Sequence, residues 1–269
     1  GNSYAPFRNH KDFLRFVEIN SGLDGNPPLH DRWSTVEQYL NLFDRKASVN
    51  IAYLLGNSPI RIDAIGWNNT PATAKDIANM KAMIRESMEE GAFGMSTGLD
   101  YPPGGYASTD ELVELSEQVR DLGGIYHTHV RYRLGDRFLD PFREAVEIGE
   151  RSGVPVHITH FYQSAPLRGG GNRLLEFVES AAERGQDVTF DSYPYVYGST
   201  RILIVFPDWA HDGGPEGLRN VLGSESAEID SERRLCLEQH PGTKCGSHIL
   251  KDPKIISLKA NRLPKCRKC

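Results

Sequence analysis

Hydrophobic and polar residues along the chain follow two periods, one typical of helices and the other of strands. Between residues 73 and 90, the apolar side chains Ile77, Met80 and Ile84 recur at three- and four-residue spacing, which predicts an amphipathic helix. Residues 48–55 are a mostly apolar run that ends at a turn-forming Gly-Asn-Ser-Pro sequence, so they predict a buried strand. The same criteria predict further helices at 34–43, 108–121, 141–151 and 172–184, and further strands at 92–97, 125–130, 154–160 and 188–192.

Two of these helices begin with a Ser-x-x-Glu sequence. Ser34 is followed by Glu37, and Ser108 is followed by Glu111. In a capping box the serine side chain accepts a hydrogen bond from the backbone N–H of the third helical residue, and the glutamate side chain accepts one from the serine backbone N–H. Both helices are therefore predicted to start at a serine cap.

Helices and strands alternate along the chain, which predicts an α/β fold with a parallel sheet. The predicted strand ends follow one another at intervals of roughly 30–40 residues, the length of a strand–helix–strand crossover. No Pro/Ser/Gly-rich linker interrupts the series, so residues 1–225 are expected to form one domain. Five strands do not close an eight-stranded barrel, which takes about 250 residues. The alternatives are an open sheet and the middle of a longer barrel.

Composition narrows the class of protein. The 269 residues carry a net charge of −5, which argues against nucleic acid or an anionic membrane as the main partner. No apolar run is long enough to cross a bilayer, and no basic segment followed by an apolar one opens the sequence. A soluble protein of the cytoplasm is therefore the expectation.

Residues 226–269 differ in character from the rest. Between residues 244 and 269 there are eight lysine and arginine residues and a single acidic one, Asp252. All the cysteines fall in the last part of the chain, at Cys236, Cys245, Cys266 and Cys269, so the preceding residues are typical of a reducing compartment. This segment is expected to be irregular, or foreign to the protein. The alternative is a module that binds metal or nucleic acid through its cysteine and histidine side chains.

Four histidines mark the ends of two consecutive predicted strands. His127 and His129 end one strand, and His157 and His160 end the next. Because side chains alternate along a strand, His127 and His129 should share a face, and His157 and His160 should lie on opposite faces. Active sites of α/β proteins lie at the carboxyl ends of parallel strands, where one imidazole from each strand can share Zn²⁺, Fe²⁺ or Mn²⁺. A strand histidine is also commonly a hydrogen-bonded core residue, so spacing alone leaves both interpretations open.

Four segments resemble motifs of the D-aminoacylases, or N-acyl-D-amino-acid deacylases, of the amidohydrolase superfamily. Residues 91–104 (GAFGMSTGLDYPPG) are similar to the family's GAxGxSTGLxYxPG motif. Residues 124–131 (GIYHTHVR) and 154–160 (VPVHITH) are similar to two of its strands. Residues 191–195 (DSYPY), followed by Ser-Thr at 199–200, are similar to its DxYPYxASST segment. The resemblance runs in consistent order over about residues 1–220.

The resemblance implies a TIM-like (β/α) barrel, incomplete in this chain, which holds strands two or three to seven. It also implies a metal-dependent hydrolase that cleaves the amide of an N-acyl amino acid or a related small molecule, with zinc or another divalent transition metal as cofactor. On the matched positions, His129 and His160 resemble the family's metal ligands, and Tyr101, Tyr193 and Ser199 its substrate-binding positions.

Some side chains are interpreted from their own position in the predicted sheet. Arg131 lies two residues beyond His129 and is expected to pair with a substrate carboxylate. His127 and His157 are expected to be core residues or supports of the site.

The chain also departs from the family pattern. Residues 1–47 contain no His-x-His pair, and Ser3 stands where the family has a cysteine ligand. The general base is expected outside this chain, and Tyr162 replaces a lysine, which predicts a different side-chain specificity. The alternative is an inactive barrel fragment without tightly bound metal. The unpaired edges of a partial sheet also predict self-association.

Overall fold

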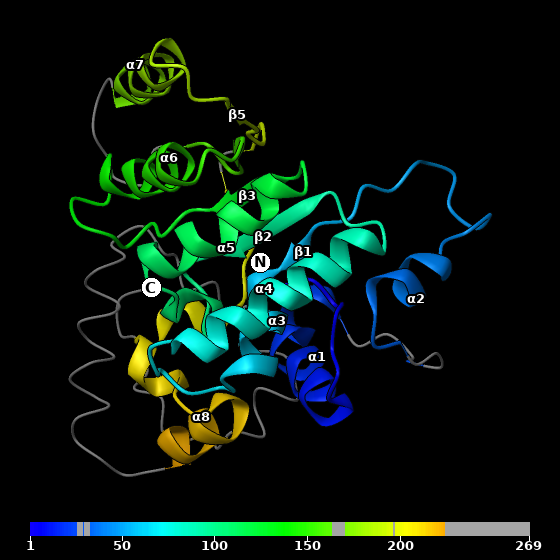
Figure 1. Cartoon of the computed structure of the whole chain (residues 1–269). Helices are drawn as coiled ribbons and strands as arrows, with labels where there is room; N and C mark the ends of the chain where they lie inside the picture. Colours follow the sequence, from blue (N-terminus) through cyan, green and yellow to red (C-terminus); the bar gives the residue numbers. More distant parts are fainter. Residues whose placement is uncertain (26–28, 30–32, 163–169, 196, 224–269) are drawn as a thin grey trace. The chain divides into compact units, whose positions relative to one another are not determined.

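The computed structural model describes residues 1–25, 29, 33–162, 170–195 and 197–223 (Figure 1). The chain divides into two compact units, Gly1–Arg201 and Ile202–Cys269. The boundary that the sequence places at residue 225 stays a prediction. The interpretations of residues 226–269 and their cysteines concern residues outside the described part of the chain.

A parallel sheet forms the centre of the first unit. Its strands are hydrogen-bonded in chain order, β1-β2-β3-β4-β5, and each neighbouring pair is parallel. This confirms the α/β prediction, and the consecutive order is that of an arc of a (β/α) barrel. The strands are β1 Leu55–Gly56, β2 Gly94–Gly98, β3 Ile125–His129, β4 Val156–Ile158 and β5 Val188–Phe190.

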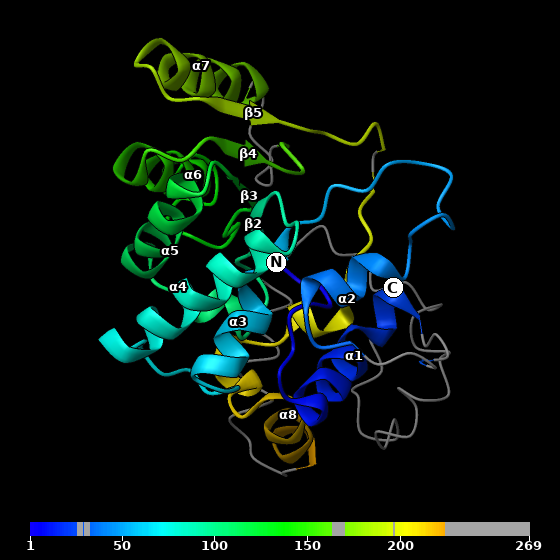
Figure 2. The same cartoon turned by 45° about the vertical axis from the view of Figure 1, so that its right-hand side comes forward.

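Helices connect the strands and cover one face of the sheet. In Figure 2, α4, α5, α6 and α7 follow one another beside β2, β3, β4 and β5. Each of these helices lies between two strands in the chain, as a series of βαβ units requires. The α-helices of this unit are α1 His10–Asp24, α2 Val36–Asn41, α3 Asn57–Ala64, α4 Ala74–Glu89, α5 Thr109–Asp121, α6 Asp140–Ser152 and α7 Gly170–Glu183, and a short 3₁₀ helix, η1, spans Gly104–Tyr106.

The main core lies between that face of the sheet and the helices. Met95, Tyr126 and Ile158 on three neighbouring strands are fully buried, and they belong to one apolar cluster with Leu112 of α5 and Phe142 of α6. Because side chains alternate along a strand, burial of Tyr126 on this face directs its two neighbours in the chain to the other face. The helix-covered side therefore determines which residues line the opposite side.

Glycine at position 94 is required by how closely β2 approaches β3. The φ angle of Gly94 is 154°, and a Cβ placed on it would collide with the carbonyl oxygen of Ile125. A side chain at this position would push the two strands apart. The glycine in the GAFG sequence is thus explained by strand pairing.

Two of the helix starts agree with the sequence and one differs. Thr73 and Asp76 form a reciprocal capping box at α4, and the Ser108 side chain caps α5. At α2 the cap is Thr35, whose side chain accepts from the Gln38 backbone, so the prediction of a Ser34 cap is wrong by one residue. A threonine adjacent to a serine offers the same hydroxyl, and sequence alone does not separate them.

The predicted strand at 48–55 is mostly absent. Only Leu55 and Gly56 pair with β2, whereas Val49 and Ile51 are exposed. The Gly-Asn-Ser-Pro sequence begins helix α3, and Pro59 lies in its first turn. Proline is tolerated there because backbone N–H groups in the first turn have no acceptor within the helix. Turn-forming residues here mark a helix start.

In the second unit the described elements are the 3₁₀ helices η2 Ile202–Val205 and η3 Asp208–His211 and the helix α8 Gly214–Gly223. Helix α8 packs against η3. Among the described helices of the chain, none combines the length and apolar character that a bilayer crossing needs.

Candidate metal centre

Four histidines lie at the carboxyl ends of β3 and β4, on the side of the sheet away from the helices. His127 and His129 are in β3, and His127 is directly opposite His157 of β4 in the parallel register. The four histidine side chains are partly buried, whereas Tyr126 and Thr128, which alternate with the histidines along β3, are fully buried. The strand alternation therefore aims both β3 histidines away from the helix layer.

The rings of His129 and His160 lie close together. Their centroids are 5.5 Å apart and their planes are nearly perpendicular. Sequence spacing predicted this convergence from neighbouring strands. The structure brings the two imidazoles to a separation at which one ion can reach both.

His160 reaches this position because it lies beyond the regular strand. Strict alternation predicted that His157 and His160 would face opposite ways, and that expectation is wrong. Strand β4 ends at Ile158, and His160 has a left-handed φ of 55°. This backbone turn returns the His160 side chain to the face that carries His129.

A buried carboxylate, Asp100, supports His129. Its Oδ2 atom lies 3.1 Å from Nε2 of His129, and the Asp100 side chain is 4% exposed. Its other oxygen, Oδ1, has no hydrogen-bond partner among the described residues. A carboxylate that accepts from one ring nitrogen fixes the tautomer and leaves the other nitrogen, Nδ1, free to bind a metal.

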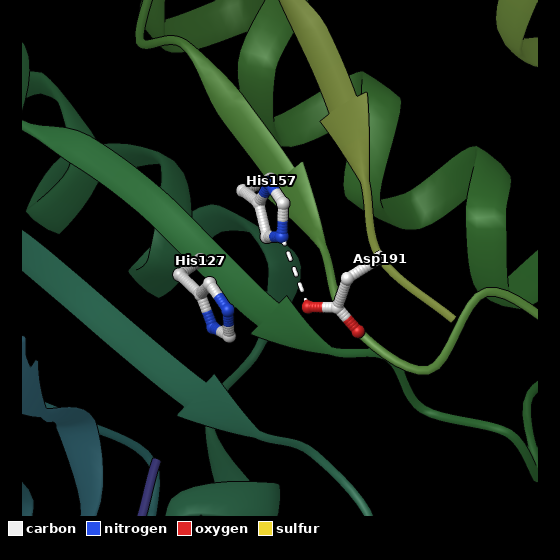
Figure 3. A group of neighbouring side chains, drawn as sticks. All are labelled: His127, His157 and Asp191. Atoms are coloured by element: carbon white, nitrogen blue, oxygen red, sulfur yellow. Dashed lines mark hydrogen bonds and ion pairs between the residues drawn. The ribbon is translucent and has the colours of Figure 1, made fainter. Parts of the chain in front are cut away.

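A second group of ligating side chains lies beside the first, on three neighbouring strands (Figure 3). The group consists of His127, His157 and Asp191, and one ligand atom from each lies within 4.8 Å of the others. The rings of His127 and His157 stack with centroids 4.9 Å apart. Nε2 of His157 lies 3.0 Å from Oδ2 of Asp191, which directly follows β5.

Asp191 also holds the backbone of the turn after β4. Its Oδ1 accepts a hydrogen bond from the His160 N–H at 3.0 Å, and its Oδ2 accepts from the Thr159 hydroxyl at 2.8 Å. Partial burial acts to raise the pKa of Asp191, but the bonds from His160, His157 and Thr159 outweigh it and lower the pKa overall. The carboxylate is therefore ionised at neutral pH.

Two of the histidines are held in the neutral form. Burial, followed by the neighbouring His157, lowers the pKa of His127 to about 4. Burial and the nearby His129 lower the pKa of His160. Neutral imidazole is the form that binds metal ions.

Tyrosines flank the histidine pair. The ring of Tyr101 lies 5.1 Å from His129, and that of Tyr193 lies 5.7 Å from His160. The Tyr101 hydroxyl is 2.6 Å from the Thr200 hydroxyl. The guanidinium carbon of Arg201 lies over the Tyr101 ring, 4.4 Å from the ring centroid. The structure thus brings both predicted tyrosines to the histidines.

The other two predicted substrate residues lie differently. Ser199 is exposed and is adjacent in the chain to Thr200. Arg131 lies beyond the end of β3, where its guanidinium donates to Glu144 of α6 at 3.2 Å and to the carbonyl groups of Gly105 and Ala107. The structure does not bring Arg131 to the histidines, and its pairing with a substrate stays a sequence prediction.

Sequence reasoning assigned no role to Asp100 or Asp191. Each lies within two residues of a strand end, Asp100 in the Ser-Thr-Gly-Leu-Asp sequence and Asp191 in the Asp-Ser-Tyr-Pro-Tyr sequence. An acidic residue just past the carboxyl end of a parallel strand is the signal that identifies both.

The donor set fits a divalent transition metal. His129 and His160 offer two imidazoles, and Asp100 offers a buried carboxylate with one oxygen that has no partner in the described part of the chain. Imidazole and carboxylate ligands suit Zn²⁺, Fe²⁺ and Mn²⁺. Ser3, in contrast, is engaged with the backbone of Gly56 and of Ala5.

Comparisons with known proteins show where these segments recur, although no family model matches the chain. A D-aminoacylase from Alcaligenes xylosoxydans xylosoxydans is 38% identical over 157 residues, which is 58% of this chain and 32% of the relative. An N-acyl-D-aspartate deacylase from the same organism is 32% identical over 180 residues, 66% of this chain and 36% of the relative. The chain thus spans about a third of the length of the curated relatives it matches.

Solved structures agree with the sequence relatives. A crystal structure of a D-aminoacylase, assigned to a subset of the amidohydrolases, superposes with a TM-score of 0.58 at 34% identity, covering 64% of this chain and 38% of the other. An N-acyl-D-glutamate deacylase from Bordetella bronchiseptica, complexed with zinc and a phosphonate inhibitor, gives a TM-score of 0.58 at 28% identity, covering 65% and 36%. Over about 60% of its length, this chain is similar in sequence and fold to D-aminoacylases, which the solved structure assigns to a subset of the amidohydrolases.

Proposed function

We propose that this chain supplies the central part of a metal-dependent amidohydrolase that cleaves the amide of N-acyl D-amino acids. The observation that carries the proposal is the convergence of His129 and His160, with Asp100 beside them, at the carboxyl ends of parallel strands. The relatives are a D-aminoacylase and deacylases of N-acyl-D-aspartate and N-acyl-D-glutamate, so a small N-acyl amino acid is the proposed substrate class.

The histidines would hold the metal, and Asp100 would orient one of them. Asp100 would accept a hydrogen bond from Nε2–H of His129, so that Nδ1 would be free to hold the ion. His160 is neutral because burial lowers its pKa, and its lone pair is available at neutral pH. A divalent cation bound there supplies Lewis acidity, which polarises an amide carbonyl and lowers the pKa of water. Zinc is the proposed ion, with another divalent transition metal as the alternative.

The tyrosines would contact the substrate from either side of the histidine pair. Tyr101 lies against His129 and Tyr193 against His160, so their hydroxyls can donate hydrogen bonds to a substrate carboxylate or to a developing oxyanion. Ser199, two residues before Arg201, is the third proposed contact. Tyr101 is anchored through Thr200 and Arg201, which keeps its ring beside the metal ligands.

Metal content and hydrolysis of the full chain test this proposal together. We expect His129→Gln to bind about one zinc ion fewer per chain than the unchanged protein, because one of its ligands is lost. His10→Gln is the matched control, since His10 is exposed and lies in α1. Activity is measured on N-acetyl derivatives of D-methionine, D-aspartate and D-glutamate, with their L-forms as comparison.

Three results would contradict parts of the proposal. Equal zinc content in His129→Gln and the unchanged chain would contradict the assignment of His129 as a metal ligand. Zinc lost only on Cys266→Ala would transfer metal binding to residues 226–269. Bound zinc without hydrolysis of any D-substrate would leave a metal-binding barrel segment and overturn the catalytic assignment of this chain.

A further inference from the structure

His127, His157 and Asp191 are not used by the proposed catalytic pair. They come from β3, from β4 and from the residue after β5, so each of three neighbouring strands contributes one ligand (Figure 3). Adjacent strands are about 4.8 Å apart, and His127 lies opposite His157 in the register, so one ion can reach both rings. Asp191 lies two residues past Thr189, which is the register partner of His157. The group is therefore a product of strand register rather than of a single loop.

His157 lies between a hydroxyl and a carboxylate. Its Nδ1 is 2.8 Å from the Thr189 hydroxyl, and its Nε2 is 3.0 Å from Oδ2 of Asp191. Without a metal ion, Nε2–H donates to the Asp191 carboxylate. A metal ion can take the place of that proton, because Nδ1–H can then donate to the Thr189 hydroxyl oxygen while Nε2 binds the ion.

His127 distinguishes a metal ion from a proton. No hydrogen bond joins its ring nitrogens to another residue of the described chain, although the ring is partly buried and stacks on His157. The Nε2 proton of His157 satisfies Asp191 but leaves His127 without a hydrogen-bond partner in the described part of the chain. A cation shared by both rings and the carboxylate satisfies all three side chains.

We propose that His127, His157 and Asp191 form a second binding site for a divalent transition-metal ion, separate from the His129–His160 pair. Two imidazoles and one carboxylate are a common ligand set for zinc and iron(II), with one or more positions left open. Tetrahedral ligands at about 2.1 Å from zinc are roughly 3.4 Å apart, so the three donor atoms need only a small closing movement. The proposal rests on these side chains and not on the proposed hydrolysis.

An ion at this second site would tie three strands together and fix the turn that carries His160. Asp191 is the link, because the same carboxylate that would bind the ion accepts from the His160 N–H and the Thr159 hydroxyl. Binding therefore stabilises the sheet at β5, which is its edge strand among the described residues. The readout can be thermal stability as well as metal content.

Zinc alone is the probe, added to the full chain after removal of metal with a chelator. We expect zinc to raise the melting temperature of the unchanged protein, and Asp191→Asn and His157→Gln to bind about one zinc ion fewer per chain. The amide introduced by Asp191→Asn retains an oxygen that can accept from the His160 N–H, so the turn is preserved. His10→Gln, which removes an exposed histidine, should bind as much zinc as the unchanged chain.

The double variant His129→Gln/Asp191→Asn separates the two sites. If they are independent, it binds about one zinc ion fewer than either single variant. If Asp191→Asn acts only by disturbing His160, the double variant matches His129→Gln, and the second site is refuted. Full zinc binding by Asp191→Asn and His157→Gln also refutes it.

Two further measurements keep the outcome clear. Circular dichroism in chelator confirms that each variant is folded, and His127→Gln replaces any variant that is not. Cobalt(II) gives visible absorption whose intensity reports its ligand geometry, and a partial loss in Asp191→Asn that adds to the loss in His129→Gln in the double variant supports the second site. Loss in His129→Gln alone supports only the catalytic pair.

Discussion

Nε2 of His129 and Oδ2 of Asp100 lie 3.1 Å apart, and the second oxygen of Asp100 is buried without a hydrogen-bond partner in the described part of the chain. A buried carboxylate oxygen without a partner is costly, and a nearby cation or water removes that cost. Asp100 lies two residues past the end of β2, whereas His129 ends β3, so parallel pairing of the two strands creates the contact. Asp100 therefore fixes the orientation of the His129 imidazole in the candidate site.

Asp100→Asn should weaken zinc binding at the His129–His160 pair by about 10- to 100-fold, because the amide does not hold the His129 proton as the carboxylate does. A competitive chelator titration of the full chain measures the affinity. Asp121→Asn, at an exposed aspartate paired with Arg120, is the control and should leave the affinity unchanged. Equal affinities in both variants would mean that Asp100 does not orient His129.

Glu111→Ala should destabilise the protein by about 3–5 kcal/mol, because it leaves the Arg61 guanidinium buried without its partner. The two side chains are 3.5 Å apart and are 5% and 1% exposed. Burial raises the pKa of Glu111, because it disfavours the charged carboxylate. Urea unfolding gives the free energies.

The double variant Arg61→Met/Glu111→Leu is the companion to Glu111→Ala. Replacing both charged residues with apolar side chains of similar volume leaves no unpaired buried charge. The double variant should therefore regain much of the unfolding free energy that Glu111→Ala loses. A double variant that is less stable than Glu111→Ala would show that the hydrogen bonds of Arg61 to Pro103 and Thr70 dominate instead.

Met95→Ala should cost about 2–5 kcal/mol of unfolding free energy, because Met95 is fully buried in β2 and the smaller side chain leaves a cavity. Val49→Ala should change stability by less than about 0.5 kcal/mol. Val49 is 73% exposed in the segment that hydrophobic patterning assigned to a strand. Similar losses in the two variants would indicate that residues 48–54 are buried after all.

The stabilising effect of Asp136 should disappear in acid. Its Oδ1 accepts from the backbone N–H groups of Phe138, Leu139 and Asp140 at the start of α6. These bonds, that to Asp140 first, lower the pKa of Asp136 below the ordinary 3.8. A lowered pKa in the folded state gives stability that is complete above 3.8 and is lost as pH falls through the lower value.

The corresponding measurement compares Asp136→Ala with the unchanged protein at two pH values. At pH 7 the variant should be about 1 kcal/mol less stable, as for loss of a helix cap. Below the folded pKa the difference should shrink towards zero. Asp136→Asn, which keeps an acceptor without the charge, separates the hydrogen bonds from the electrostatic part. A difference that does not change with pH would contradict the ionised cap.

The repeating strand–helix pattern could be predicted because it depends on neighbours in the sequence. Apolar spacing in α4 and the short runs that became β3 and β4 are local, and so are the Thr73–Asp76 cap and the Ser108 cap. The failure at 48–55 has the opposite cause. Val49 and Ile51 favour a strand, but a strand needs a partner to pair with, and only Leu55 and Gly56 reach β2.

For the site, the sequence by itself determined that histidines end two consecutive strands, and parallel pairing made their convergence predictable. Tertiary structure decided which atoms meet. The left-handed turn at His160 depends on where β4 ends. The support of His129 by Asp100 and the grouping of Asp191 with His127 and His157 join residues about 30 or more positions apart. Arg131 likewise turned to Glu144 because β3 ends before it. Such partners depend on strand register and on where each strand stops, which no local pattern of hydrophobic and polar residues encodes.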